Sequence, residues 1–386
     1  MTSYIDELYK NLNKLEKEKP SVVSLFSGCG GLDFTFHKAG YKHLWANDFD
    51  SFSTQSFKNN ISKSMVFGSI EDLDLDIIPK ADVVLGGFPC QDFSQIWKKP
   101  GLNGTRGNLY TYFVDVVKRT KPKFFIAENV KGLLSANKGI AIKTIITDFQ
   151  SMETKYLVIP QLVNFANYGV PQFRERVLII GIRMDTEFDY KIPKFTHTDC
   201  LKNLISAGRA LEKIPKEASN QEHMNIKDKT RRLLEKIPAG GNFTSIPESD
   251  PLYVKGMISH VYRRIDPELP SKTLISSGGG GTWGYHYPEP RALTNRERAR
   301  IQGFPDSFVF EGSFGEVRKQ IGNAVPPVGT IPFCNAFTAF FEGKFRKTDL
   351  ELIGQQFSMH DIKKVIKKIS KSDGFNISEI FDPLLV

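Results

Sequence analysis

The chain has 386 residues, of which 40% are hydrophobic and 25% are charged. This composition excludes a chain that is disordered throughout, and the length predicts a full hydrophobic core with an appended domain. The formal net charge of +9 is compatible with a polyanionic partner, but by itself it identifies none.

Cysteine usage and the amino end exclude further classes of protein. The four cysteines, Cys29, Cys90, Cys200 and Cys334, are widely separated and form no CxxC pair, so neither a disulfide scaffold nor a metal site is expected. Residues 1–20 lack the apolar segment of a signal peptide, and no uninterrupted apolar run is long enough to span a bilayer. We therefore expect a reduced cytoplasmic compartment, no metal and no membrane.

The chain begins with an amphipathic segment. Apolar residues recur at helical spacing from Ile5 to Leu15, and Pro20 ends the pattern. The spacing predicts a helix over residues 4–19. Residues 1–20 are thus expected to form an N-terminal helical extension whose role is packing.

From residue 21 onward, short apolar runs alternate with helical stretches. This rhythm predicts an α/β fold with a mostly parallel sheet covered by helices, and residues 21–183 form its first domain. The predicted strands are residues 22–26, 43–46, 82–85, 124–127, 158–162 and 177–182.

After residue 183 the alternation of short apolar runs and helical stretches ends. Residues 184–290 are rich in Pro, Gly, Lys and Arg with scattered aromatic residues, which predicts a separate, loop-rich domain. A helix is predicted over residues 293–302, where Thr294 and Glu297 have the spacing of a capping box.

The last part of the chain is divided in two. Residues 291–340 are expected to return to the first domain, and residues 341–386 to form a helical tail. The basic stretch 363–371 of this tail has one apolar stripe, which favours a surface helix over a nucleic-acid contact.

A glycine-rich turn, FSGCGG, follows the first predicted strand and precedes a helix over residues 32–39. Glycines at the carboxyl end of a sheet let the backbone approach a ligand closely. One strand further, Asp48 can accept hydrogen bonds from both hydroxyls of a ribose. The two features favour an adenosine-containing cofactor, and a tight turn without a ligand is the alternative. The spacing differs from GxGxxG, which weakens the case for a dinucleotide.

A second glycine turn, GGFPCQDFS, carries Cys90 after the strand 82–85. Pro89 fixes the turn next to the sulfur, and a partly exposed cysteine at a sheet edge can act as a nucleophile. A buried structural cysteine is the alternative.

Three further charged residues lie next to predicted strands, one after a strand and two before another. Glu128 either caps the following helix or works as an acid or hydrogen-bond partner. Arg174 and Arg176 lie on one face if their segment is extended, where they could hold a phosphate or a base oxygen. Equally, they could be surface charges paired with Glu175.

Six motifs, taken together and in order, resemble the DNA cytosine-5 methyltransferase family, chiefly its bacterial restriction-modification enzymes. They are FSGCGGLDFTF, GGFPCQDFS, ENVKGLL, QFRERVLIIGIR, RALTNRERARIQGFP and QIGNAVPP, and the resemblance covers roughly residues 21–340. It implies a Rossmann-like S-adenosylmethionine-dependent methyltransferase fold. It also implies transfer of a methyl group to carbon 5 of cytosine in double-stranded DNA. Residues 21–183 would then form the catalytic and cofactor-binding domain, and residues 184–290 the target-recognition domain.

The resemblance assigns the cofactor site position by position. Ser69 stands where the family usually has an acid that contacts adenine, which puts that contact in doubt. The positions that match the family's S-adenosylmethionine site are Phe26, Gly28, Gly30, Gly31, Asp48, Ile70, Leu109 and Asn323.

The resemblance also assigns the catalytic residues. Cys90 matches the nucleophile that adds to carbon 6 of the base, whereas Cys29 matches a variable position and is expected to be a small filler. Glu128 matches the glutamate that contacts N3 and the exocyclic amine, and Arg174 and Arg176 match arginines near the thiol and the cytosine. Carbon 6 is inaccessible in a stacked duplex, so the cytosine must be flipped out.

DNA contacts are expected from two regions. Residues 91–106 match the mobile loop that closes over the flipped base, with Gln91, Ser94 and Arg106 as candidate contacts. The recognition domain adds Arg263, Arg264, Lys272, Thr273, Trp283 and Tyr285. Arginine suits guanine in the major groove, but phosphate contact or local packing remains open for each of these residues.

Several alternatives remain at this point. A cytosine-5 methyltransferase acting on tRNA is the first, and a catalytically silent DNA-binding protein or a nicotinamide oxidoreductase on a similar sheet are the others. Intact Cys90, Glu128 and Asn323 favour the enzyme. We expect a monomer in the bacterial cytoplasm, associated with the nucleoid, with a cognate restriction endonuclease as a possible partner.

Overall fold

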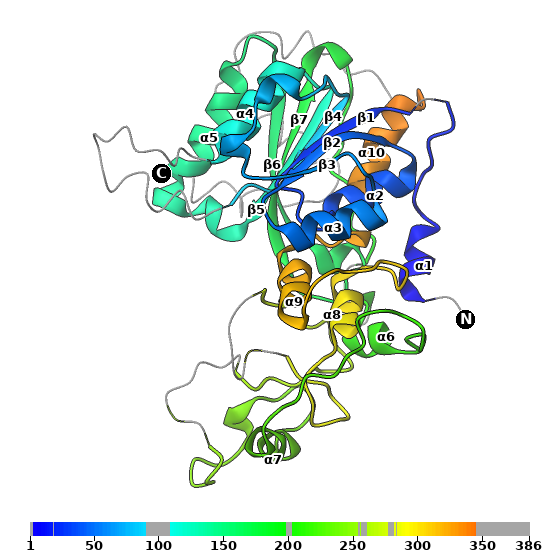
Figure 1. Ribbon diagram of the computed structural model, residues 1–386. Coiled ribbons are helices and arrows are strands. Elements are labelled where there is room, and N and C mark those ends of the chain that lie inside the picture. Colours follow the sequence, from blue (N-terminus) through cyan, green and yellow to red (C-terminus); the bar gives the residue numbers. More distant parts are fainter. Residues whose placement is uncertain are drawn as a thin grey trace.

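The computed structural model describes residues 3–17, 19–89, 109–197, 203–253, 255, 261–276, 282 and 284–344. At its centre is a seven-stranded sheet with the strand order β3-β2-β1-β4-β5-β7-β6 (Figure 1). Strands β3, β2, β1, β4 and β5 run parallel, and β7 is antiparallel to both β5 and β6. The strands are β1 (Ser21–Leu25), β2 (Lys42–Asp48), β3 (Met65–Phe67), β4 (Val83–Gly86), β5 (Phe124–Val130), β6 (Tyr156–Asn164) and β7 (Glu175–Arg183).

Helices cover both faces of this sheet. Helices α4 and α5 lie on one face, and α2, α3 and α10 lie on the other (Figure 1). Helices α8 and α9 lie between the sheet and a lobe that carries α7 (Figure 1). The helices are α1 (Tyr4–Tyr9), α2 (Gly31–Ala39), α3 (Ser51–Asn60), α4 (Leu109–Thr120), α5 (Ile140–Ser151), α6 (Ala207–Leu211), α7 (Asp228–Lys236), α8 (Asn295–Gln302), α9 (Phe314–Asn323) and α10 (Ile331–Phe341).

Each of the six predicted strands is present, and the sheet is mostly parallel as expected. The sequence missed β3, because three residues are too few to show a strand pattern. The predicted helix over residues 293–302 is α8, and Thr294 and Glu297 form its capping box. The predicted tail helix lies outside the described residues.

The predicted helix over residues 4–19 was wrong in its length, because α1 ends at Tyr9. Beyond it the backbone turns away to make tertiary hydrogen bonds. The amide of Asn13 donates to Oδ1 of Asn335 at 2.8 Å, and the amide of Leu15 donates to the carbonyl of Ala39 at 2.9 Å. These contacts replace the intrahelical bonds that the apolar spacing implied.

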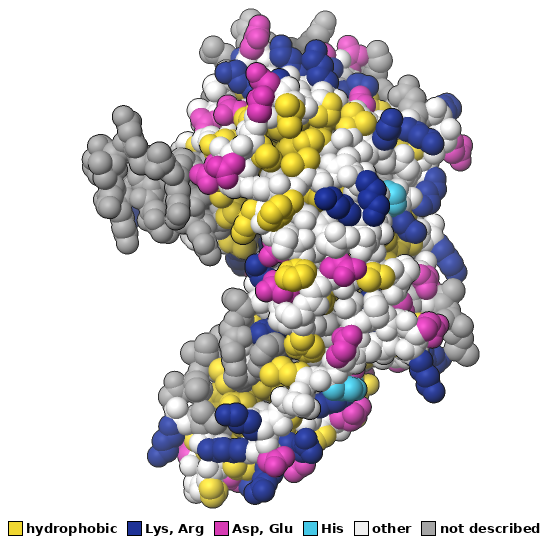
Figure 2. All heavy atoms as spheres, viewed as in Figure 1, with side chains coloured by type: hydrophobic (Ala, Val, Ile, Leu, Met, Phe, Trp, Pro, Cys, Tyr) yellow, Lys and Arg dark blue, Asp and Glu magenta, His cyan; other side chains and the backbone are white. Residues whose placement is uncertain are grey.

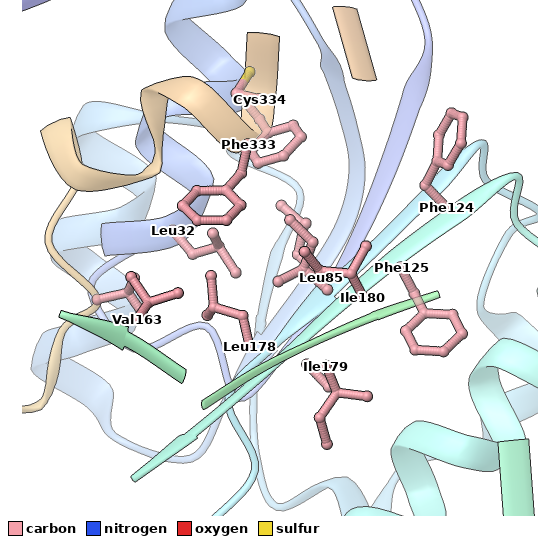
Figure 3. Close-up of a cluster of buried hydrophobic side chains, with 14 of the residues drawn as sticks. Leu32, Leu85, Phe124, Phe125, Val163, Leu178, Ile179, Ile180, Phe333 and Cys334 are labelled. Atoms are coloured by element: carbon pink, nitrogen blue, oxygen red, sulfur yellow. The ribbon is translucent and has the colours of Figure 1, made fainter. Parts of the chain in front are cut away.

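The core is built from apolar strands that are buried on both faces. Along β7, Leu178 and Ile180 point to one side of the sheet and Ile179 to the other (Figure 3). On β5, Phe124 stacks on Phe337 of α10 with ring centroids 4.5 Å apart. Its neighbour Phe125 stacks on Phe149 of α5 at 4.4 Å, so β5 joins the two helical layers.

The lobe that carries α7 has a small core of its own. Leu233, Ile237, Phe243, Ile246 and Val261 pack together apart from the main core. Its described residues are joined mostly by turns and loops, as the composition of residues 184–290 predicted. Figure 2 shows a concave notch between this lobe and the part that contains the sheet.

Within the described residues, the segment Phe314–Phe341 is long and apolar enough to cross a membrane, with a mean hydropathy of 1.2 in its best window. However, 67% of that window is buried inside the protein. Phe333 and Phe337 of this segment belong to the main core. Its apolar character is therefore that of a core helix.

Candidate active site

A cavity of about 570 Å³ opens where β1, β2, β4 and β5 end. Open parallel sheets bind ligands at this edge, outside the carboxyl ends of the strands. One end of the cavity is lined by the turn from Phe26 to Gly31, and the other by Gly86–Pro89 and Glu128. The two glycine turns predicted from the sequence therefore face one common space.

The first turn needs glycine for two different reasons. A Cβ on Gly30 would lie 2.1 Å from Cδ1 of Ile61, and one on Gly31 would lie 2.3 Å from the carbonyl oxygen of Val325. Gly28 has open space around it, but its φ is +55°. Gly30 is the N-cap of α2 without a side-chain hydrogen bond, so the first amides of this helix are left to the cavity.

Asp48 lies at the end of β2 and braces this turn. Its carboxylate accepts hydrogen bonds from the amides of Gly28 at 2.7 Å and Asp50 at 2.9 Å. Burial raises the pKa of Asp48 to about 6, and these two hydrogen bonds oppose the rise. Oδ2 of Asp50 in turn pairs with Nζ of Lys319 at 2.7 Å, so the segment after β2 is linked to α9.

Two cavity residues escaped the sequence analysis. Phe49 is 64% exposed although it is a large apolar side chain, and it lines the cavity next to Asp48. An exposed aromatic face at a cavity can stack on a planar ring. Lys319 also lines the cavity. The only sequence signal for Phe49 was its place directly after Asp48.

Glu128 lies in β5 and points into the cavity. Its Oε1 accepts from Nε of Arg176 at 3.0 Å. Burial raises the pKa of Glu128, and the positive charges of Arg176 and then Arg174 oppose the rise. The following 3-10 turn has Val130 as its N-cap, so Glu128 does not cap a helix here.

Arg174 is buried more deeply than Arg176. Its Nη2 donates to the carbonyls of Gly322 at 2.8 Å and Ala324 at 3.0 Å. Burial lowers the pKa of Arg174 to about 9, and the nearby Arg176 lowers it further than Glu128 can restore. Glu175 pairs with Lys131 at 3.1 Å rather than with either arginine.

The turn before Cys90 is held by a neighbouring strand. Nδ2 of Asn129 donates to the carbonyl of Phe88 at 2.9 Å, and Pro89 lines the cavity. Cys90 itself lies outside the described residues, as do Gln91, Ser94, Arg106 and Trp283. By contrast, Cys29 and Cys334 are buried, and burial raises the pKa of each thiol.

The remaining predicted cofactor residues differ in position. Asn323 lines the cavity from α9. Ile70 is buried in the main core, and Leu109 packs against that core at the start of α4. Neither Ile70 nor Leu109 is among the described residues that line the cavity.

A buried polar chain links the segment around Leu274 to this site. Oε1 of Gln172 accepts from the amide of Leu274 at 3.0 Å, and its Nε2 donates to Oε1 of Gln302 at 2.7 Å. Nε2 of Gln302 donates at 2.5 Å to the carbonyl of Ala324, which also accepts from Arg174. The sequence gave no signal for the two glutamines.

The predicted DNA-contact residues have different surroundings. Arg264 is buried and donates to four carbonyls, those of Leu234, Ile237, His286 and Tyr287. Tyr285 is buried and stacks on Tyr262 at 6.0 Å. Local packing, the alternative left open for each residue, thus describes Arg264 and Tyr285 in this structure.

The structure has a second cavity of about 540 Å³. Three other predicted DNA-contact residues help to line it, namely Arg263, Lys272 and Thr273. The Lys272 ammonium lies 5.4 Å from the centre of the Phe173 ring. The hydroxyl of Thr273 donates to the Phe173 carbonyl at 2.6 Å.

Solved structures share this fold. A DNA modification methyltransferase encoded within an E. coli prophage matches with a TM-score of 0.63 at 22% identity, over 84% of this chain and 99% of that one. The S. pombe Dnmt2 methyltransferase matches with a TM-score of 0.55 at 15% identity, over 84% and 99%. At these identities the likeness concerns the fold alone. It confirms the predicted fold class, an α/β fold with a mostly parallel sheet.

The sequence comparisons identify the family. Residues 21–330 match the C-5 cytosine-specific DNA methylase model. The chain is 57% identical over 346 residues to the type II methyltransferase M.NgoFVII of Neisseria gonorrhoeae, over 88% of this chain and 92% of that protein. It is 43% identical over 328 residues to the type II methyltransferase M.BbvI of Brevibacillus brevis, over 79% and 87%. The chain therefore belongs to the C-5 cytosine-specific DNA methylase family, and its enzyme class is DNA (cytosine-5-)-methyltransferase.

Membership confirms the expectation from the six motifs and decides for DNA over the tRNA alternative. It implies S-adenosylmethionine as the methyl donor and DNA as the substrate.

Proposed function

We propose that this enzyme flips a cytosine out of double-stranded DNA and methylates its carbon 5 through a bond between Cys90 and carbon 6. The observation that carries the proposal is the single cavity that joins the Phe26–Gly31 turn to Glu128. A cofactor and a base bound there would lie side by side. Pro89, the residue before Cys90, lines the same cavity.

The residues present fit S-adenosylmethionine. Asp48 would accept from the ribose hydroxyls, Phe49 would stack on the adenine, and the uncapped amides of α2 would face the carboxylate. Asn323 would close the site from α9. When bound, this cofactor supplies an electrophilic methyl group on a sulfonium.

The chemistry follows from the poor nucleophilicity of carbon 5. The Cys90 thiolate would add to carbon 6, and the electron pair of the 5,6 double bond would move toward the N3 side of the ring. Glu128 would donate a proton or hydrogen bond at N3, a role that its raised pKa favours because the carboxyl then retains a proton more readily. Arg176 would orient Glu128.

Carbon 5 is then nucleophilic enough to take the methyl group from the sulfonium, which leaves a neutral thioether. A base such as water would take the proton from carbon 5, and the electron pair of that bond would re-form the 5,6 double bond and expel the Cys90 thiolate. N3 would return its proton to Glu128, which restores the enzyme. In this scheme Arg174, held by the carbonyls of Gly322 and Ala324, fixes the wall of the cavity behind Glu128.

Cys90→Ser tests the proposal. We expect loss of methyl transfer from labelled cofactor to duplex DNA, with cofactor binding retained. Wild-type enzyme should form a denaturation-resistant adduct with duplex DNA that contains 5-fluorocytosine. Full activity in Cys90→Ser would refute the mechanism.

We further propose that the enzyme acts as a monomer in the bacterial cytoplasm and modifies the site of a restriction endonuclease. Its 57% identity to a type II methyltransferase supports this role. A plasmid carrying the gene, propagated in a host without other methyltransferases, should show 5-methylcytosine at one short sequence by bisulfite sequencing. Methylation scattered over unrelated sequences would contradict the role.

A further inference from the structure

The lining of the second cavity combines apolar side chains with several basic ones. Arg263, Lys272 and Arg298 line it, and Asp266 is the one acidic residue among the described lining residues. Arg264 also lines it, but its guanidinium is taken up by carbonyls. The cavity therefore carries more positive than negative charge.

Arg298 has no visible structural reason for its charge. Helix α8 carries three buried arginines at alternate positions. Arg296 donates to Ser219, Pro305 and Phe308, and Arg300 pairs with Asp306 and donates to three carbonyls. Arg298 is only 2% exposed, and its Nε and Nη2 have no partner among the described residues.

The surroundings make this charge less favourable still. Burial and then the positive charge of Arg318 in α9 lower the pKa of Arg298 to about 9, although Glu297 opposes the shift. The adjacent Glu297 is engaged by Arg291 at 2.7 and 2.8 Å. A buried cation without a partner is destabilising, and an anion bound from outside the chain would supply the missing partner.

We propose that the second cavity binds a phosphate group of the DNA backbone, with Arg298 as its principal cation and Lys272 at its mouth. The proposal rests on duplex DNA being the substrate. Arginine suits this ligand, because its planar fork matches two phosphate oxygens.

A phosphate bound in the second cavity would fix the position of the DNA relative to the active-site cavity. Arg318, whose Nη2 donates to the carbonyl of Thr282 at 3.2 Å, lies on the same helix as Lys319 and Asn323 of the active-site cavity. Helix α9 thus lines the first cavity and contacts Thr282, a lining residue of the second. Arg298 is in this sense a positioning residue.

Arg298→Met tests the proposal, because methionine keeps much of the apolar stem and removes the charge. Arg119→Met is the matched control, since Arg119 lies at the end of α4, on the edge of the sheet opposite the active site. Binding of a duplex that contains the methylation site is measured by fluorescence anisotropy at several KCl concentrations. For Arg298→Met the slope of log K against log [salt] should become shallower by about 0.9, the value for one phosphate contact. The control should keep the wild-type slope.

Duplexes with a single methylphosphonate identify the contact. In the wild type, neutralising one particular phosphate should weaken binding, and in Arg298→Met that same substitution should have no further effect. Identical profiles in wild type and variant, with an unchanged salt slope, would overturn the proposal.

Titration with inorganic phosphate separates the two sources of this anion. Phosphate that binds the wild type and not Arg298→Met, together with unchanged DNA profiles, would assign the cavity to a free anion and reject the DNA backbone.

If Arg298→Met does not fold, as judged by S-adenosylhomocysteine binding, Arg298→Lys replaces it. Lysine retains the charge but not the fork, so DNA binding should weaken at the same phosphate. A wild type that neither binds nor methylates duplex DNA would instead disprove the proposed function.

Discussion

Single residues at this site owe their chemistry to burial. Asp48 has two amide donors and yet its pKa rises to about 6, because desolvation is the largest effect on it. Glu128 faces the same penalty, and its nearest counter-charge, Arg176, compensates only in part. The cavity therefore holds two carboxyl groups that take up protons more readily than exposed ones.

The raised pKa of Asp48 makes a prediction about stability. The protonated form is favoured in the folded chain, so its contribution to stability is complete below pH 3.8 and is lost as pH rises through about 6. Relative to Asp48→Asn, the free energy of unfolding of the wild type should fall by about 1 kcal/mol between pH 5 and pH 7. Urea unfolding of both proteins at each pH measures this difference. A difference that does not vary with pH would contradict the assignment.

At the scale of elements, close approach between segments far apart in the sequence shapes the site. The start of α2 meets the connection between α9 and α10, where a Cβ on Gly31 would lie 2.3 Å from the Val325 carbonyl oxygen. Within α9 itself, a Cβ on Gly322 would lie 2.5 Å from Cα of Ser276. Helix α9 and the connection after it are thus in close contact with the Phe26–Gly31 turn and with the segment around Ser276.

Gly31→Ala should destabilise the protein by about 1–3 kcal/mol, because neither backbone can give way easily. Gly315→Ala is the control within α9, where nothing lies within 4 Å of the added Cβ. That substitution should stabilise the helix by up to about 1 kcal/mol. Denaturant unfolding compares the two variants. Equal stability of Gly31→Ala and wild type would show that this contact is not needed.

At the scale of the whole molecule, the N-terminal extension connects distant elements. The Tyr4 hydroxyl donates to the carbonyl of Arg300 in α8. Glu7 pairs with Arg209 of α6 at 2.6 Å, and the amide of Asn13 donates to Asn335 of α10 at 2.8 Å. The extension therefore packs against the sheet-bearing part and against helices next to the second lobe.

Ile5, which is completely buried in the main core, tests the importance of this packing. Ile5→Ala should lower the free energy of unfolding by about 2–5 kcal/mol, the usual range for such a truncation. The exposed Lys10 offers a control, and Lys10→Ala should change stability by less than about 0.5 kcal/mol. A small effect of Ile5→Ala would mean that the extension is dispensable for the fold.

The sequence by itself determined six of the seven strands, the two glycine turns and the family. Apolar runs of strand length and capping signals are local, so the six predicted strands and α8 could be recognised without tertiary information. The motifs also identified Asp48 and Glu128, which the structure brings to one cavity.

Only the tertiary structure decided what the buried polar side chains do. Gln172 and Gln302 are linked to Leu274 and Ala324 by contacts that span more than 100 positions or join separate helices, and no local pattern encodes such pairs. Likewise Arg264 and Arg298 are both buried arginines in basic segments, and only their partners separate them. Arg264 donates to carbonyls, whereas Nε and Nη2 of Arg298 have no hydrogen-bond partner among the described residues. The physical reason is that the cost of burying a charge depends on neighbours that the fold, and not the adjacent sequence, supplies.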